Sequence, residues 1–321
     1  MRVLLVACIA LLASEASGQP SLSQFPTKPI HVVVPSPPGG PPDLIIRMLT
    51  PKMAGLGQPL VVENRAGAGG IVGTAYVAKT PPDGYTWLVT TASHVNTPPF
   101  NANVPFDPVK DFTHVTLIAQ NFGQALTVPA SSSFRSVQEL IAGAKRNPGK
   151  LNYGSAGIGT ASHIPAEVMK SMSGTDIALV PYKGVAEAMT DLIAGRIDLF
   201  FVGTQIAAQQ AHAAKARVLA LTGAKRWKGL PEVPTMQEAG FEGYQLINWF
   251  GLWLPAGAPP EIAKRIHGEV LKALSDPEVM RQFDVQGLEG VGMPPREFAQ
   301  FVEKEARFIT ELARKIRAGT R

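Results

Sequence analysis

The chain contains 321 residues, of which 45% are hydrophobic and 17% are charged. A length that suits two domains of about 150 residues, with fewer charges than the usual ~25%, excludes a disordered chain and a coiled coil. The net charge is +5, but residues 307–321 hold five basic residues and one Glu, so +4 of it lies in the C-terminal tail and nucleic-acid binding is not indicated.

The N-terminus has the pattern of a secretory signal peptide. Arg2 precedes an 11-residue apolar run, Val3–Ala13, and small residues follow as far as Gly18. The run is shorter than the ~20 residues of a membrane span, so we predict cleavage after Gly18 and export to the periplasm. A lipoprotein signal at Leu5–Cys8 is the alternative, but it would leave almost no apolar stretch before the cut. The mature chain would lack Cys8, the single cysteine, which excludes thiolate and disulfide chemistry.

The first part of the mature chain alternates predicted strands with predicted helices. The strands are expected at Ile30–Val34, Leu60–Val62 and Tyr85–Val89, and the helices at Asp43–Leu56 and Ile71–Lys79. This order is typical of a parallel sheet.

A second alternating set follows in the middle of the chain. Its strands are expected at Leu151–Tyr153, Ile177–Val180, Ile197–Val202 and Val218–Leu221, and its helices at Val137–Arg146, Ser162–Ser173 and Val185–Ala194. Ser136 suits the N-cap of the first of these helices. The last third is different, because Glu261–Leu274, Pro277–Gln286 and Pro295–Arg317 read as three successive helices.

Two long apolar segments, Val115–Val128 and Gln245–Leu254, flank the middle set. A chain that leaves one domain and later returns would produce such a pair, so we expect two crossovers between two open α/β sheets. The predicted domains are 19–122 with 248–321, and 123–247. Two additional edge strands in a single sheet are the alternative.

The segment PSPPGGPPD, Pro35–Asp43, joins the first predicted strand to a helix. Ligands of open α/β sheets bind at the carboxyl ends of strands, where helix N-termini present free N–H groups. Gly39 and Gly40 would let a ligand approach the backbone, and the prolines would stiffen the loop. A rigid turn with Asp43 as a helix cap is the structural alternative.

The segment NYGSAGIGTASH, Asn152–His163, repeats the order of strand, glycine-rich loop and helix. Its glycines and hydroxyl side chains suit an anion, but no Lys stands at the spacing of a nucleotide-binding P-loop. A flexible surface loop is the alternative.

Other patterns carry less weight. The hydroxyl groups of Thr91 and Ser93, with His94, follow the third predicted strand and would face the same crevice. RAGAGGIVG, Arg65–Gly73, lacks the third glycine of a dinucleotide-binding motif. The histidines have no metal-ligand spacing, so neither a metal nor a cofactor is expected.

Several of these segments together are similar to one family. PSPPGGPPD, VVENRAGAGG (61–70), PPDGYT (81–86), NYGSAGIGT (152–160), PYKG (181–184), VPTMQEAGF (233–241) and WFGLWLPAGAP (249–259) occur in the order seen in the substrate-binding proteins of tripartite tricarboxylate transporters, the Bug family. The chain resembles that family over nearly its whole mature length.

The resemblance implies a two-lobed periplasmic binding protein of type II fold, expected as a monomer without enzymatic activity. It would capture a small carboxylate, dicarboxylic or aromatic, between its lobes and deliver it to the transmembrane permease of the transporter. Carried over by position, the ligand-binding residues would be Gly39, Gly40, Pro41, Pro42, Asp43, Thr91, Ser93, Ser155, Ala156, Gly157, Gly159, Thr160, His163, Gly203 and Thr204. Backbone amides of the two glycine-bearing loops would hold the carboxylate.

The sequence departs from the family pattern at three places. Ser36 stands where an aromatic residue is common, Pro42 where a small hydroxyl residue is common, and Val202–Thr204 where Asp-Asn is frequent. These changes would allow a more apolar acid. Phe122 and Phe201 are further candidates for the pocket, but core packing is the favoured interpretation for each.

Two other functions stay open at this point. An exported enzyme acting on a carboxylated substrate would share the loops, with Ser155 and His163 as the residues to inspect. An effector-sensing domain of a regulator would need a DNA-binding module, for which the chain has no spare segment.

Overall fold

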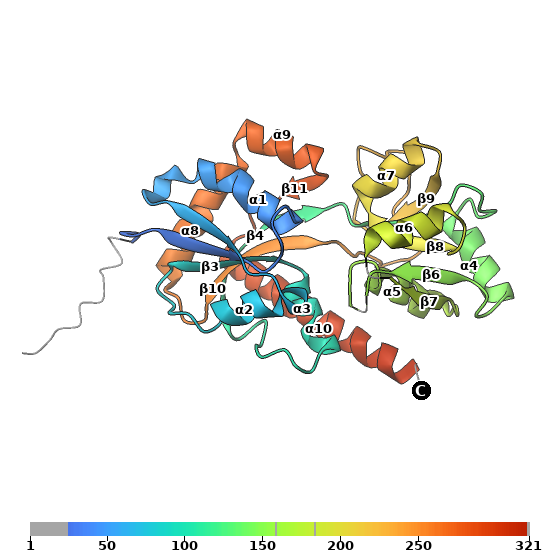
Figure 1. Ribbon diagram of the computed structural model, residues 1–321, viewed down its shortest axis with the longest axis horizontal. Coiled ribbons are helices and arrows are strands. Elements are labelled where there is room, and N and C mark those ends of the chain that lie inside the picture. The colour runs from blue at the N-terminus through green and yellow to red at the C-terminus, as the bar shows by residue number, and fades with distance from the viewer. Residues whose placement is uncertain (1–24, 158, 183, 320–321) are drawn as a thin grey trace, which may run out of the picture.

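The computed structural model describes residues 25–157, 159–182 and 184–319. Two separate sheets lie side by side along the long axis of the molecule, each covered by helices on both faces (Figure 1). Each sheet with its helices is called a lobe. The prediction of an α/β fold with two open sheets is confirmed. The predicted signal peptide, 1–18, lies outside the described residues, and no helix of the described ranges is long and apolar enough to cross a bilayer.

The first lobe contains a six-stranded sheet in the order β11-β4-β10-β3-β1-β2. Successive side chains of a strand point to opposite faces of this sheet. Val32 packs in the core with helices α1 and α8, whereas Val33 packs in the core with α2 and α10. The strands are β1 (Ile30–Val34), β2 (Leu60–Asn64), β3 (Thr86–Thr91), β4 (Phe112–Asn121), β10 (Trp249–Pro255) and β11 (Leu288–Gly290). The helices are α1 (Pro41–Leu49), α2 (Ile71–Val77), α3 (Ser93–Asn96), α8 (Pro260–Leu274), α9 (Pro277–Val285) and α10 (Pro295–Gly319), with short 3₁₀ turns at Thr50–Lys52, Ala54–Leu56, Ala68–Gly70 and Pro98–Phe100.

The second lobe contains a five-stranded sheet in the order β7-β6-β8-β5-β9. Phe201 faces the core beneath α5, and its neighbour Phe200 faces the core beneath α6 and α7. The strands are β5 (Gln124–Pro129), β6 (Asn152–Ser155), β7 (Ala178–Pro181), β8 (Leu199–Gly203) and β9 (Ala216–Leu221). The helices are α4 (Val137–Arg146), α5 (Ile164–Ser173), α6 (Val185–Ile193) and α7 (Thr204–His212).

Two segments carry the chain between the lobes, as the apolar pattern predicted. Only Phe122 and Gly123 separate β4 in the first sheet from β5 in the second, and the chain returns just before β10. Gly123 has φ +89°, and a Cβ there would lie 2.4 Å from the Gly223 nitrogen, so only glycine fits this passage. Asn121 ties the two crossings together, because its Oδ1 accepts from the N–H groups of Gly123 and Asn248, each at 2.9 Å.

The alternative of two edge strands in one sheet is wrong, because β5 and β10 are interior strands of different sheets. Both run antiparallel to their neighbours, whereas β1, β2 and β3 and then β6, β7 and β8 are parallel. Each sheet therefore contains both parallel and antiparallel pairs. The antiparallel strands β5 and β10 are the ones that follow a crossing from the other lobe.

The long helix α10 also joins the lobes. Phe298 and Val302 belong to the core of the first lobe, whereas Ile309 and Leu312 pack in the core of the second. Figure 1 shows the helix running beneath the first lobe toward the second.

Most predicted elements are present. Ser136 caps α4 by accepting from the Glu139 N–H at 3.1 Å, as expected. Three elements were not predicted: the single-turn helix α3, the helix α7 and the three-residue strand β11. The helix expected at Asp43–Leu56 begins earlier, at Pro41, and continues after Leu49 only as 3₁₀ turns.

Candidate functional site

The first glycine-rich loop lies where expected, between the end of β1 and the start of α1. Gly40 is the N-cap, and Pro41 and Pro42 form the first turn of the helix. Gly39 has φ +80°, which favours glycine, whereas Gly40 has φ −69° and accepts any side chain by backbone conformation alone. The Gly40 N–H donates to the Pro37 carbonyl over 3.3 Å, a long bond. The loop is thus closed on itself by a weak hydrogen bond.

Asp43 fixes this loop rather than standing open to a ligand. Its carboxylate is 2% exposed and accepts from the Gly39 N–H, Arg47 Nε and Asn64 Nδ2, each at 2.9 Å. Burial raises the pKa of Asp43, but these hydrogen bonds outweigh it and leave the pKa below its usual value. Asp43 therefore positions the Gly39 amide and stays ionised at neutral pH.

Glycines of the segment RAGAGGIVG allow close packing against the first glycine-rich loop. A Cβ on Gly73 would lie 2.8 Å from the Pro35 Cβ, and one on Gly70 would lie 3.3 Å from the Pro35 carbonyl oxygen. The second βα connection therefore presses against the first loop through glycine.

Thr91 and Ser93 lie together at the end of β3, which is the neighbour of β1. Thr91 Oγ1 donates to Ser93 Oγ at 2.9 Å and accepts from the Ser93 N–H at 3.1 Å. The Ser93 hydroxyl hydrogen is not used in either bond, so it can donate to a further acceptor.

A short network of hydroxyl groups shapes the second glycine-rich loop. Ser155 is fully buried, and its Oγ donates to the Gly157 carbonyl at 2.8 Å and accepts from the Gly157 N–H at 3.1 Å. Thr160 Oγ1 also donates to the Gly157 carbonyl, at 2.7 Å, and Ser162 Oγ accepts from the Ala156 N–H at 2.9 Å. The loop is therefore closed by neutral groups.

His163 completes this loop at the start of α5. It is 3% exposed, and its Nδ1 accepts from the Gly159 N–H over 3.3 Å. Burial lowers the pKa of His163 and outweighs the Glu167 carboxylate, which raises it, and Lys170 adds to the lowering, so the ring is neutral at pH 7. Ser155 and His163 share no hydrogen bond in the described structure, although both bond within the same loop.

The two loops belong to different sheets, and a few residues join them. The Phe100 ring lies edge-on to His163 with 6.3 Å between centroids, and a Cβ on Gly159 would lie 3.3 Å from it. A cavity of about 40 Å³ is lined by Ala92 of the first lobe and by Gln124 and Ala161 of the second. Ala92 stands between Thr91 and Ser93, and Ala161 follows Thr160, but none of these three predicted residues lines the cavity itself.

Gly203 and Thr204 lie at the end of β8. Gly203 pairs with Gln124 across the sheet, and Thr204 is buried at the start of α7. Gln124 therefore connects this pair to the small cavity that Ala92 and Ala161 line.

Sequence reasoning missed three residues. Phe100 and Gln124 join the lobes, and the Ser36 hydroxyl is a buried group without a hydrogen-bond partner among the described residues. Gln124 had a signal, a polar side chain inside an apolar segment, and Ser36 had one as a departure from the family pattern, whereas Phe100 had none.

Three other sequence candidates lie in the cores. His94 is stacked on Phe106 and lies tilted against Trp253, and burial lowers its pKa to about 3. Phe201 is fully buried, and Phe122 packs beside Trp227. None of the three belongs to the loops described above. In the described ranges no three side chains of His, Asp or Glu converge on a possible metal position.

A family profile described as "Tripartite tricarboxylate transporter family receptor" matches residues 45–317. The chain is 38% identical to the "UPF0065 protein in tcbD-tcbE intergenic region" of Pseudomonas sp. strain P51, over 95% of this chain and 90% of that protein. Among solved structures, the periplasmic binding protein BugD is 32% identical with a TM-score of 0.73, over 91% of this chain and 98% of its own. Rpa4515 of R. palustris, solved with adipate, is 34% identical with a TM-score of 0.75, over 90% and 98% of the two chains.

Proposed function

The chain belongs to the tripartite tricarboxylate transporter receptor family of periplasmic solute-binding proteins, and from this premise we propose that it captures a small dicarboxylate between its lobes. It would release that ligand unchanged to the transmembrane permease of the transporter. We further propose that residues 19–122 with 248–321, and 123–247, form the two domains. Sequencing the N-terminus of the exported protein should find cleavage after Gly18.

The proposal for the ligand draws on both a neighbour and the local chemistry. Rpa4515, a third identical in sequence, was solved with adipate, a linear dicarboxylate. In this chain the loops at Gly40 and Gly159 belong to different sheets and offer amide and hydroxyl donors. A molecule with two carboxylates could engage one loop with each end.

The observation that carries this proposal is that each loop contains weakly bonded amides. The N–H groups of Gly40 and Gly159 make 3.3 Å bonds within their own loops, to the Pro37 carbonyl and to His163 Nδ1. The Thr160 N–H makes a bond of the same length to the Gly157 carbonyl. The loop amides of Gly39, Ala156 and Gly157 make shorter bonds, of 2.9 to 3.1 Å. A carboxylate oxygen is a stronger acceptor than these weak partners, so we expect it to take over the weakly bonded amides of Gly40 and Gly159.

Hydroxyl groups would supply the remaining contacts. The unpaired Ser36 Oγ would lie 3.3 Å from a Cβ on Gly40, so it borders the same point of the loop. At the start of α3, just after the strand β3, Ser93 has a hydroxyl hydrogen that its bonds with Thr91 do not use. Three or four charge-assisted bonds of about 1.5–3 kcal/mol would reach the ~8 kcal/mol of a micromolar ligand.

Contacts from both lobes would also explain ligand-driven closure. Only a closed arrangement lets one molecule bond to Gly40 and Gly159 at the same time. Ligand would therefore shift the population toward that arrangement by its difference in affinity for the two states.

Gly40→Val tests the proposal by calorimetric titration with adipate. Gly40 has φ −69°, so valine fits the backbone and adds bulk beside the amide and Ser36. We expect at least tenfold weaker binding with the thermal melting midpoint nearly unchanged. The matched control is Gly268→Val on α8, where an added Cβ would meet nothing within 4 Å. Equal adipate affinity for Gly40→Val and wild type would reject the assignment.

A further inference from the structure

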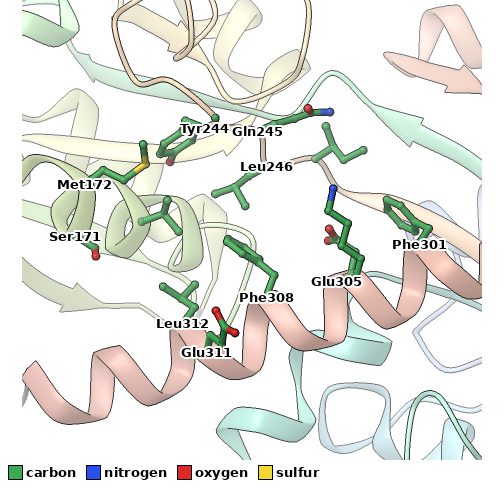
Figure 2. Close-up of a pocket in the computed structure, with 14 residues that line it drawn as sticks. Ser171, Met172, Tyr244, Gln245, Leu246, Phe301, Glu305, Phe308, Glu311 and Leu312 are labelled. Atoms are coloured by element: carbon green, nitrogen blue, oxygen red, sulfur yellow. The ribbon is translucent and has the colours of Figure 1, made fainter.

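A second pocket, of about 390 Å³, lies away from the two loops, between α5, the return segment Gly243–Ile247 and α10 (Figure 2). α5 belongs to the second lobe, whereas α10 packs in the cores of both. The pocket therefore lies between one helix of the second lobe and two segments that pass between the lobes, and we call it the hinge pocket.

The walls of this hinge pocket are largely apolar. Figure 2 shows Met172 on α5, Leu246 on the return segment and Phe308 on α10 around one space. Met172 is 46% exposed and Phe308 is 40% exposed, so both offer apolar surface that a ligand could cover. Phe301 adds a second aromatic ring to the lining, and ring faces attract cations.

The charged groups that line the pocket favour a positively charged ligand. Its lining holds two carboxylates, Glu305 and Glu311, and one ammonium, Lys304, so the net charge is −1. Glu305 is half-buried, whereas Glu311 and Lys304 are exposed and well solvated.

Glu305 differs from its neighbour Glu303 on the same helix. Glu303 pairs with Arg307 at 3.6 Å, whereas Glu305 makes no ion pair within 4.0 Å in the described part of the chain. Burial raises the pKa of Glu305, against the opposing effects of Trp249 and Lys304. A half-buried carboxylate without a counterion is stabilised by a cation placed against it.

We propose that the hinge pocket binds a small organic cation, with an ammonium group against the Glu305 carboxylate and an apolar or aromatic body along Met172 and Phe308. Glu305 also lines the small cavity that reaches Ala92 and Ala161, and the two cavities share Leu246 and Ile247 as well. Binding of the cation does not depend on the proposed function of the two glycine-rich loops.

The test uses benzylamine and its uncharged counterpart benzyl alcohol, titrated separately into the mature full chain by calorimetry in the absence of adipate. We expect benzylamine to bind at least tenfold more tightly than benzyl alcohol. Glu305→Gln should remove this difference, whereas the matched control Glu303→Gln should retain it. Equal binding of the two probes, no binding of benzylamine, or an unchanged preference in Glu305→Gln would overturn the proposal.

A second variant covers the case in which Glu305→Gln does not fold. Ser171 is exposed on α5 at the rim of the pocket, so Ser171→Trp should fill the space without changing a buried group. We expect this variant to lose benzylamine binding and to retain wild-type adipate affinity. Retained benzylamine binding in Ser171→Trp would count against the pocket, whatever the result with adipate.

Discussion

The two glycine-rich loops occupy equivalent places in their lobes, each between a strand and the next helix, but different chemistry holds each of them. The first is held by an ionised, buried carboxylate, Asp43, and stiffened by proline at both ends. The second is held by neutral groups, the hydroxyls of Ser155, Thr160 and Ser162 and the ring of His163.

This difference means that the loops should respond to different perturbations. Removal of one charge should loosen the first loop, because three donors converge on Asp43. In the second loop the bonds are spread over Ser155, Thr160, Ser162 and His163, so single changes should cost less. Lowering the pH should affect the second loop first, since histidine takes up a proton at higher pH than aspartate.

The largest effect is expected for Asp43→Ala. It leaves the Gly39 N–H and the Asn64 amide without their buried acceptor, and it leaves Arg47 without its carboxylate. We expect a loss of about 2–4 kcal/mol in the free energy of unfolding, measured by urea denaturation. A loss below that of any single change in the second loop would contradict the contrast between the loops.

Gly157→Ala should have the largest effect among single changes in the second loop. Gly157 has φ +129°, a region that is nearly closed to other residues, so alanine should destabilise the protein by about 1–3 kcal/mol. Thermal and urea unfolding would measure this. The control is Gly268→Ala in the helix α8, where alanine should instead stabilise by about 0.5–1 kcal/mol.

Ser162→Ala removes one neutral acceptor from the second loop. The Ala156 N–H then loses the acceptor with which it makes a 2.9 Å bond. Ser162 is only 5% exposed, so water cannot readily replace its hydroxyl group. We expect a cost of about 1–2 kcal/mol in unfolding free energy and weaker binding of adipate by calorimetry. Ser171→Ala, on the exposed face of the following helix, should change stability by less than about 0.5 kcal/mol.

The pH dependence of stability should separate the loops most directly. The pKa of His163 is lowered in the folded state, so only the unfolded chain takes up this proton below about pH 6.5 and stability falls as the pH falls. The pKa of Asp43 is also lowered, but its contribution is lost only as the pH falls below about 4. His163→Gln should therefore reduce the slope of stability between pH 6.5 and 5 by up to ~1.4 kcal/mol per pH unit, as measured by urea unfolding.

Asp43→Asn is the companion variant in that experiment. It should leave the slope between pH 6.5 and 5 unchanged, because Asp43 is ionised throughout this range. The buried rings of His94 and His114, with pKa values near 3 and 4, are present in every variant and cancel in the comparison. An unchanged slope in His163→Gln would contradict this expectation, because it would mean that the His163 ring takes up a proton equally in the folded and unfolded chain.

Local patterns predicted the elements whose signals are contained in a few neighbouring residues. The strand β1 and the helix α4 have the predicted bounds, because alternation, apolar period and an N-cap at Ser136 are local properties. α7 was missed because its sequence, rich in Ala and Gln, has a weak amphipathic pattern and its burial comes from the sheet beneath. β11 has three residues and exists only because β4 lies beside it.

The candidate site divides in the same way. The glycine-rich segments, their position after strands and their hydroxyl side chains could be found from the sequence. Phe100 could not, and Gln124 had only the signal of a polar residue in an apolar segment, because each takes its place from contact with the other lobe. The sequence also could not show which backbone N–H groups of the loops are available to a ligand. Asp43 and His163 each accept a hydrogen bond from an N–H group of their own loop, and only the structure shows this.

The sequence by itself determined the α/β class, the two sets of strands and helices, the crossings between them and the family. These follow from hydrophobic period, glycine and proline positions, and motif order, all of which are written along the chain. Only the tertiary structure decided which N–H groups make weak bonds, that Asp43 is a support and that α10 and the return segment enclose a second pocket. Such properties depend on distances between residues far apart in sequence, and packing sets those distances.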